Sequence, residues 1–215
     1  MKLPGPLYVI AAGTLATAAY VWWQNMGAVP ADGGDAADAG TADTTLSFTD
    51  IGSSVSNIFT SVAASVADTN VQAFLTLIRT GEGTTGPNGY RTLFGGGTFD
   101  SYARHPNIAV TRGALTSTAA GAYQILYRTW LEISAAYGLT DFSPASQDTA
   151  AVALIKRRGA LADVIAGRFD SAIVKCNKEW ASLPGSPYGQ PTLTLDRAHA
   201  VLAMAGGSQT DGGYA

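Results

Sequence analysis

Glu82 is the residue whose type and position most clearly suit catalysis. Apolar residues recur before it at helical spacing, at Val71, Phe74, Leu75 and Ile78. The sequence that follows, Gly-Thr-Thr-Gly-Pro-Asn-Gly, cannot continue a helix. Partial negative charge at a helix C-terminus disfavours ionisation of a carboxyl group, and apolar cover would raise its pKa further. Glu82 is therefore a candidate general acid near neutral pH, and the alternative is a solvated glutamate at a helix end.

The remaining reactive side chains favour structural roles. Cys176 is the single cysteine, which excludes a disulfide within one chain, and its apolar surroundings predict a buried thiol rather than a nucleophile. His105 and His199 lack the spacing of metal ligands, so we predict no metal site. His105 precedes Pro106 in a loop and is expected to hold backbone, whereas His199 is expected in the core or on the surface of a late helix.

The charge distribution divides the chain into two parts. Among 215 residues, the first 69 carry one lysine and six aspartates, whereas residues 70–215 carry twelve basic and ten acidic side chains. The length allows one domain of about 150 residues with additional segments. The mildly basic second part suits a negatively charged polymer, but its surplus of two charges is too small to predict nucleic acid binding.

The N-terminal segment, residues 1–29, has the pattern of a membrane anchor. From Leu7 to Val29 there are 23 uncharged residues, and a helix needs about 20 to span a bilayer. Lys2 precedes this run and aspartates follow it, so the amino terminus is expected in the cytoplasm and everything after residue 30 outside. A cleaved signal peptide is the alternative, but the apolar run is long and only one basic residue precedes it.

Two further segments connect the predicted anchor to the domain. Residues 30–48 are rich in Ala, Asp, Gly and Thr and predict a flexible, self-repelling linker. Residues 49–69 predict an amphipathic helix that packs on the domain or on a partner. An interfacial membrane helix is disfavoured there, because its polar face lacks Lys and Arg. Residues 208–215 form a tail.

The domain, residues 70–207, is predicted to be α+β and mainly helical. Aromatic and β-branched residues around a glycine run predict a small β-hairpin over residues 90–99, followed by loops over 100–121. Ser143 and Pro144 predict a helix start, with Gln147 as the capping partner of Ser143. Helices are expected from 122 to 133, 144 to 155, 161 to 166, 169 to 181 and 195 to 205.

Seven motifs in register resemble one family. They are Gly81-Glu82-Gly83-Thr84, Asn88-Gly89-Tyr90, Phe99-Asp100-Ser101-Tyr102 with His105-Pro106, Ser117 to Gln124, Phe142-Ser143-Pro144 with Ser146-Gln147-Asp148, Arg158-Gly159-Ala160-Leu161, and Trp180 to Gly185 with Tyr188-Gly189-Gln190. In this order they closely resemble the lambda-type endolysins, which are phage peptidoglycan lytic transglycosylases. The resemblance covers about residues 70–207 and implies a lysozyme-like α+β fold.

The resemblance also implies roles for individual residues. It places the family's single catalytic glutamate on Glu82. Tyr123 and Gln124 would line a saccharide groove, with Tyr188 and Gln190 on its opposite lip. The implied substrate is the glycan strand of peptidoglycan, and no metal or cofactor is needed.

One departure from the family concerns a loop carboxylate. The family has Thr-Asp where this chain has Asp100-Ser101, so the carboxylate is displaced by one position. Two other functions stay open. One is a hydrolytic muramidase that uses Glu82 together with Asp100 as the base that activates water. The other is a non-catalytic protein, membrane-tethered and glycan-binding or structural in a virion.

The predicted anchor would place the catalytic domain outside the membrane that holds it. That membrane would be the host inner membrane for a lysis enzyme, or the virion and its membrane for an enzyme that opens the wall during entry. Other virion proteins are partners under the second setting.

Overall fold

The computed structural model describes residues 61–113 and 115–211. The predicted anchor, residues 1–29, and the linker, residues 30–48, lie outside the described residues. Within the described ranges no helix is long and apolar enough to cross a membrane. At the described end of the predicted 49–69 segment, residues 61–65 are helical and Val62 is fully buried in the core.

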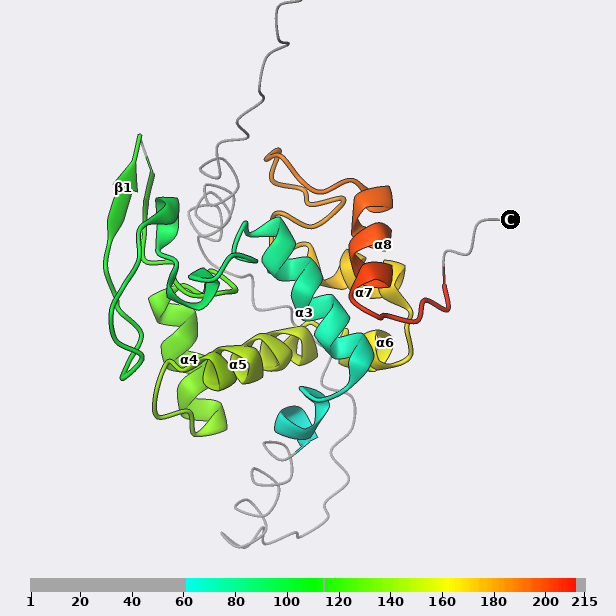
Figure 1. Cartoon of the computed structure of the whole chain (residues 1–215), viewed down its shortest axis with the longest axis horizontal. Coiled ribbons are helices and arrows are strands. Elements are labelled where there is room, and N and C mark those ends of the chain that lie inside the picture. Colours follow the sequence, from blue (N-terminus) through cyan, green and yellow to red (C-terminus); the bar gives the residue numbers. More distant parts are fainter. Residues whose placement is uncertain (1–60, 114, 212–215) are drawn as a thin grey trace, which may run out of the picture.

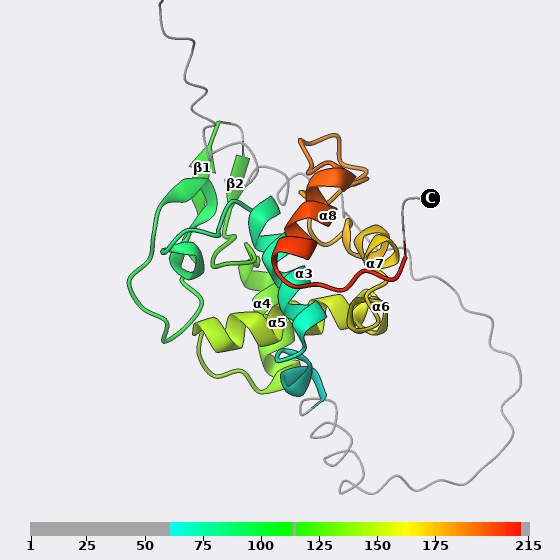
Figure 2. The same cartoon turned by 45° about the vertical axis from the view of Figure 1, so that its right-hand side comes forward.

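The central element is α3, Thr69–Gly81, which crosses the middle of the domain in Figures 1 and 2. The helix begins where the Asp68 carboxylate accepts hydrogen bonds from the backbone amides of Asn70 and Val71. Its apolar residues are almost fully buried and pack against α5, α6 and α8. Glu82 directly follows its last residue, so a well-packed helix fixes the position of the candidate acid.

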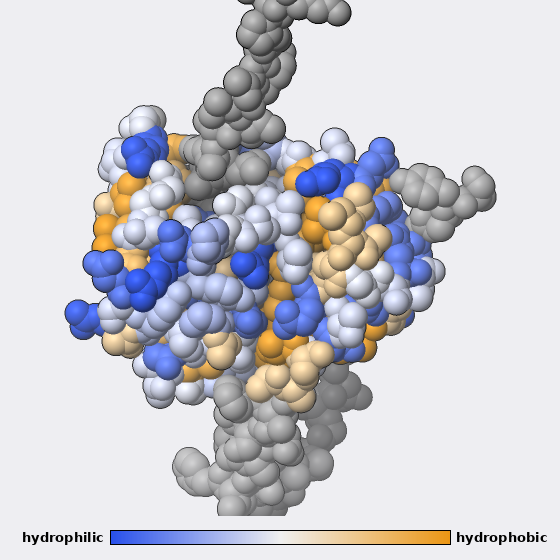
Figure 3. Space-filling model, in the orientation of Figure 1, coloured by the Kyte–Doolittle hydropathy of each residue, from blue (hydrophilic) through white to orange (hydrophobic). Residues whose placement is uncertain are grey.

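The further helices that follow α3 in the described part of the chain confirm the mainly helical prediction. They are α4 (Tyr127–Tyr137), α5 (Pro144–Arg157), α6 (Leu161–Ile165), α7 (Phe169–Cys176) and α8 (Leu195–Met204). The middle of α5, residues 150–155, is entirely buried and forms much of the core. In Figure 1 the strand β1 lies on the far side of the domain from α7 and α8, and Figure 3 shows hydrophilic side chains gathered over that strand side.

The small sheet lies elsewhere than predicted. Its strands are β1 (Val110–Arg112) and β2 (Leu115–Ser117), an antiparallel pair inside the region expected to be loop. The predicted hairpin over 90–99 instead contains two 3-10 turns, η1 (Gly89–Arg91) and η2 (Phe94–Gly96). One isolated bridge, Thr92 with Thr98, closes this loop. The glycine run curls the backbone too tightly for paired strands, since Gly95 and Gly96 both have positive φ.

Two helix boundaries also differ from the prediction. α4 begins at Tyr127 rather than at residue 122, because the backbone turns through Gly121 (φ 78°) and Gln124 (φ 47°). An isolated bridge between Ala120 and Ile125 closes this turn. α7 ends at Cys176 rather than at residue 181, and the segment beyond it turns back toward the end of α3. Apolar residues continue at helical spacing across both breaks, so periodicity does not mark where α4 begins or where α7 ends.

Gln147 does not cap α5 as predicted. Ser143 caps the helix by accepting from the backbone amide of Ser146, with Pro144 in the first turn as expected. The buried Gln147 side chain points inward, and its oxygen accepts from the Ala122 amide at 2.9 Å. Its nitrogen donates to the carbonyls of Tyr90 at 3.0 Å and Phe142 at 2.8 Å. These backbone groups need partners away from water, and Gln147 therefore joins three segments.

Gly121→Ala should destabilise the domain strongly. Gly121 has φ 78°, and a Cβ there would lie 2.2 Å from the Gln147 side-chain oxygen. The left-handed backbone costs about 1–2 kcal/mol for a residue with a Cβ, and displacing the Gln147 hydrogen bonds adds about 1–3 kcal/mol. We therefore expect a loss of about 3 kcal/mol in the free energy of unfolding, measured by urea denaturation.

The matched control for this substitution is Gly138→Ala. Gly138 has φ 62° but no atom within 4 Å of the added Cβ, so only the backbone cost of about 1 kcal/mol is expected. Equal losses in the two variants would contradict the bracing role of Gln147.

Candidate active site

Glu82 is held by a single side-chain hydrogen bond. The residue is only 6% exposed, and its Oε1 accepts from the Ser182 hydroxyl at 2.7 Å. Its Oε2 is buried and has no hydrogen-bond partner among the described residues. The two oxygens of the carboxyl group are therefore in different environments, and Oε2 is the one left for a ligand.

Gly81 allows Ser182 to approach this closely. A Cβ at Gly81 would lie 2.5 Å from the Ser182 hydroxyl oxygen, so no larger residue fits between α3 and Ser182. Ser182 is fully buried, and its carbonyl accepts from the Leu193 amide at 2.8 Å. In the Gly81-Glu82 motif, Glu82 supplies the carboxyl group and Gly81 leaves the space that the Ser182 hydroxyl occupies. Ser182 lies within the Trp180 to Gly185 motif, but nothing in the sequence pattern indicated that it is the partner of Glu82, 100 residues away.

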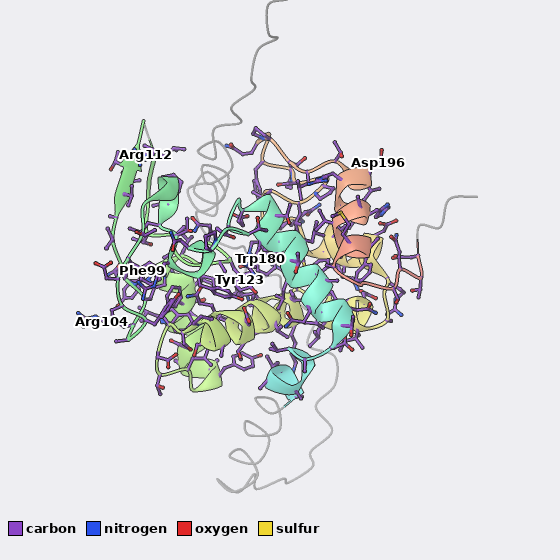
Figure 4. The ribbon with its side chains drawn as sticks, in the orientation of Figure 1. Phe99, Arg104, Arg112, Tyr123, Trp180 and Asp196 are labelled. Carbon is purple, nitrogen blue, oxygen red and sulfur yellow. The ribbon has the colours of Figure 1, made fainter. Side chains whose placement is uncertain are left out.

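A second contact brings the 121–125 turn to the same place. The Trp180 indole nitrogen donates to the Tyr123 carbonyl at 3.2 Å. In Figure 4 Tyr123 and Trp180 are labelled next to each other beside α3. The end of α3, the turn and the segment after α7 thus converge around Glu82.

Burial raises the pKa of Glu82 from 4.5 to about 7, and the Ser182 hydrogen bond opposes this rise. The sequence predicted a raised pKa from the helix end and apolar cover, and the burial is the larger cause. At neutral pH both protonation states are accessible. A carboxyl group in this state can donate a proton and later accept one.

Glu82 lines a small cavity together with Gln124. The cavity measures about 20 Å³, enough for one water-sized group. Gln124 is 5% exposed, and its side-chain oxygen, like Glu82 Oε2, has no partner among the described residues. The complete lining is Glu82, Tyr123, Gln124, Ile125, Leu126, Thr129, Leu154, Glu179 and Trp180.

The Tyr123 hydroxyl is engaged away from this cavity. It donates to the Asp148 carboxylate at 2.6 Å, and the Tyr90 hydroxyl donates to the same oxygen at 2.8 Å. The Arg79 guanidinium lies over the Tyr90 ring, 4.8 Å from its centroid. Burial raises the pKa of Asp148 against the opposing effect of these hydrogen bonds. Asp148 was part of a recognised motif, but nothing in the sequence assigned it this buried position.

The other two groove candidates, Tyr188 and Gln190, are not part of the lining of the Glu82 cavity. Both are partly exposed. Asp100, the base of the muramidase alternative, is exposed and is also absent from the lining. The structure therefore brings Glu82, Tyr123 and Gln124 together and leaves these three outside the cavity.

Glu179 is the second carboxylate at the cavity, but both of its oxygens are taken. Oε1 lies 3.1 Å from Arg157, and Oε2 lies 2.7 Å from Arg158. These ion pairs attach the segment after α7 to the end of α5. Of the carboxylates that line the cavity in the described part of the chain, only Glu82 is not paired with a cation.

His105 has the structural role expected from its place before Pro106. The ring is buried, accepts from the Asn107 amide at 3.1 Å and donates to the Ile125 carbonyl at 2.9 Å. Burial lowers the pKa of His105 to about 4, so the ring is neutral at neutral pH. By binding the Ile125 carbonyl, His105 supports the turn that contributes to the cavity.

The two remaining reactive side chains lie away from the Glu82 cavity. Cys176 is fully buried, as predicted, and burial raises the pKa of its thiol, which disfavours the nucleophilic thiolate. His199 is on α8 and lies 2.6 Å from Asp170. Neither residue lines the Glu82 cavity.

A family model described as endolysin matches residues 72–209. This chain belongs to the endolysin family. It is 42% identical to the endolysin of Escherichia phage lambda over 144 residues, which is 64% of this chain and 91% of that relative. It is 40% identical to the endolysin of Escherichia phage P2 over 154 residues, covering 64% of this chain and 93% of that relative.

The fold agrees with this assignment. A bacteriophage lambda lysozyme complexed with a chitohexasaccharide superposes with a TM-score of 0.63 and 41% identity, covering 66% of this chain and 97% of the other. A second structure of lysozyme from bacteriophage lambda gives a TM-score of 0.59 and 39% identity, again covering 66% of this chain and 97% of the other. The predicted lysozyme-like fold is confirmed, and the chain is a lysozyme-like phage enzyme of peptidoglycan degradation and host lysis.

Replacing Glu82 by Gln should change how stability depends on pH. The folded protein keeps the Glu82 proton up to about pH 7, whereas a glutamate with the ordinary pKa of 4.5 has lost it well below that. Folded wild type therefore binds more protons than the unfolded chain in this window, and its stability falls as pH rises. Glu82→Gln has no such proton to lose. Between about pH 4.5 and pH 7 its free energy of unfolding should therefore rise by up to about 3 kcal/mol relative to that of wild type.

The measurement is urea denaturation of both proteins at a series of pH values. Glu132→Gln is the matched control for replacing a carboxylate by an amide, because the Glu132 side chain is 56% exposed and its ion pairs with Arg128 and Arg157 contribute little to stability. Parallel curves for wild type and Glu82→Gln would contradict a raised pKa of Glu82.

Proposed function

We propose that this enzyme is a peptidoglycan lytic transglycosylase. It cleaves the β-1,4 bond between N-acetylmuramic acid and N-acetylglucosamine and leaves a 1,6-anhydro-muramic end. The observation that carries this proposal is the single available carboxyl group: among the described residues at the cavity, only Glu82 is free of a cation. A glycosidase that uses water requires two carboxyl groups, whereas a transglycosylase requires one.

Glu82 would act twice in each turnover. Its proton passes to the glycosidic oxygen as the bond from that oxygen to C1 of muramic acid breaks. The C6 hydroxyl of the same sugar then forms a bond to C1, and its proton passes to the Glu82 carboxylate, which restores the acid. A pKa of about 7 suits both steps at neutral pH. Attack within one sugar also gains effective concentration over attack by water.

The glycan would lie across Tyr123 and Gln124, with Tyr188 and Gln190 on the opposite lip. Tyr123 and Gln124 line the Glu82 cavity, which supports their part of this arrangement. The complex of a similar phage lysozyme with a chitohexasaccharide supports a glycan as the ligand. Exposed Arg104 and Arg112 on the strand side, labelled in Figure 4, suit the carboxylates of peptidoglycan stem peptides.

Mass spectrometry of muropeptides released from purified sacculi tests this reaction. Wild type should release anhydro-muramic ends, and Glu82→Gln should lower the rate of release about 10²- to 10⁴-fold, because the proton donor is lost. Glu132→Gln serves as the control at an exposed glutamate and should retain full activity.

The same assay separates the alternatives. Reducing-end sugars from wild type, lost in Asp100→Asn, would establish the hydrolytic muramidase. An unchanged result with Glu82→Gln in every assay would establish the non-catalytic glycan-binding or virion structural protein.

We further propose that residues 1–29 anchor the enzyme in a membrane with its domain outside. The support is the uncharged run from Leu7 to Val29 and the charge asymmetry around it. Full-length protein should sediment with membranes and resist extraction at high pH, whereas a variant lacking residues 2–29 should be extracted. Mass spectrometry of the mature N-terminus would reveal a cleaved signal peptide. Recovery in purified phage particles would support a virion enzyme over one used only in lysis.

A further inference from the structure

Two unpaired oxygens belong to side chains that line the same cavity. Glu82 Oε2 and Gln124 Oε1 are both buried, and neither has a hydrogen-bond partner among the described residues. A buried acceptor without a partner costs about 1–3 kcal/mol. The cavity has room for about one water-sized group. A bound group that carries a hydrogen-bond donor would supply a partner that these acceptors lack.

The orientation of the Gln124 amide is fixed by its own contacts. Its nitrogen donates to the Gly121 carbonyl at 2.9 Å and the Thr92 carbonyl at 3.2 Å, which uses both hydrogens. The oxygen is consequently the end that has no protein partner. Gln124 also has φ 47°, a left-handed conformation that costs about 1–3 kcal/mol in a residue other than glycine. Strain of this kind, kept beside a candidate acid, indicates a functional position.

The reaction leaves a role for such an acceptor. This step rests on the proposed transglycosylase function. When Glu82 is protonated, its hydrogen is directed at the glycosidic oxygen and its Oε1 already accepts from Ser182, so a separate acceptor is suited to orienting the hydrogen of the nucleophile. Gln124 Oε1 is the other unpaired acceptor of the cavity.

We propose that Gln124 orients the attacking C6 hydroxyl of the muramic acid. The hydroxyl donates to Gln124 Oε1 while its oxygen faces C1. As the C1 bond to the leaving oxygen breaks, the Glu82 proton moves to that oxygen and the C6 oxygen bonds to C1. The hydroxyl hydrogen then transfers from its contact with the amide oxygen to the Glu82 carboxylate, now the stronger acceptor. All atoms and protons are accounted for without a further reactant.

Gln124 thereby determines which nucleophile reacts. A cavity of this size holds either the C6 hydroxyl or a water molecule, and the amide oxygen favours the hydroxyl because it belongs to a sugar already bound. Without that acceptor the hydroxyl loses its orientation and water can take its place. The ratio of anhydro ends to reducing ends is thus the property that Gln124 controls.

The test compares two substitutions in the full-length enzyme. Gln124→Met removes the acceptor and both donors. In Gln124→Glu the new carboxyl group faces two carbonyl oxygens, which disfavour its ionisation. Its hydroxyl can then donate to one of these carbonyls, and its own carbonyl oxygen still accepts a hydrogen bond. Gln72→Met, on the exposed side of α3, is the matched control and should behave as wild type.

We expect Gln124→Met to lower kcat about 10- to 100-fold with a smaller change in KM, and to raise the share of reducing ends. Gln124→Glu should recover most of the anhydro share. An unchanged product ratio in Gln124→Met, with wild type producing anhydro ends, would overturn the role of Gln124 and leave the transglycosylase intact. If wild type itself produced reducing ends, the proposed transglycosylase function would be wrong.

A second measurement does not depend on whether Gln124→Met folds. A crystal structure of Glu82→Gln with a bound peptidoglycan tetrasaccharide should place the C6 hydroxyl within about 3.2 Å of Gln124 Oε1. A C6 hydroxyl out of hydrogen-bonding range of that oxygen would overturn the inference.

Discussion

The burial of Glu82 against Ser182 is the interaction on which the rest of the site depends. It joins the end of α3 to a segment 100 residues later and leaves one carboxyl oxygen for a ligand. The contact requires the absence of a side chain at Gly81 and a fixed course for the segment after α7. That course is fixed by the Trp180 bond to Tyr123 and by the ion pairs of Glu179. Much of the surrounding structure thus holds the Ser182 hydroxyl beside the Glu82 carboxyl group.

Two buried glutamines give the 121–125 turn its shape. Gln147 reaches from α5 and binds backbone groups of the turn and of two neighbouring loops. Gln124 is part of the turn, and its side chain donates to the Gly121 carbonyl of the turn and to the Thr92 carbonyl of a neighbouring loop. A turn without regular secondary structure cannot satisfy its own backbone groups, so amide side chains with both donors and an acceptor are suited to this position. The resulting rigidity allows an irregular turn to form a wall of the active site.

The sequence predicted α3, the start of α5, the burial of Cys176 and the position of Glu82 at a helix end, because periodicity and local capping are short-range signals. It misplaced the sheet and began α4 too early, because Gly121 and Gln124 change the backbone without interrupting the apolar spacing. Ser182 and Asp148 could not be found as partners of Glu82 and Tyr123, since contacts over such separations depend on the tertiary fold. The family resemblance located the site, whereas the structure distinguished Gln124, which lines the cavity, from Gln190, which does not.

Three departures from ordinary stability rules meet at the Glu82 cavity. A carboxyl group buried without a cation, an amide oxygen without a partner and a left-handed glutamine all occur at the Glu82 cavity. Each is unfavourable for folding, and a ligand with hydrogen-bond donors would offset the cost of the two unpaired oxygens. The well-packed residues of α3 and α5 supply the stability that offsets these costs. Part of the binding free energy of a sugar would therefore come from satisfying acceptors that the fold leaves unpaired.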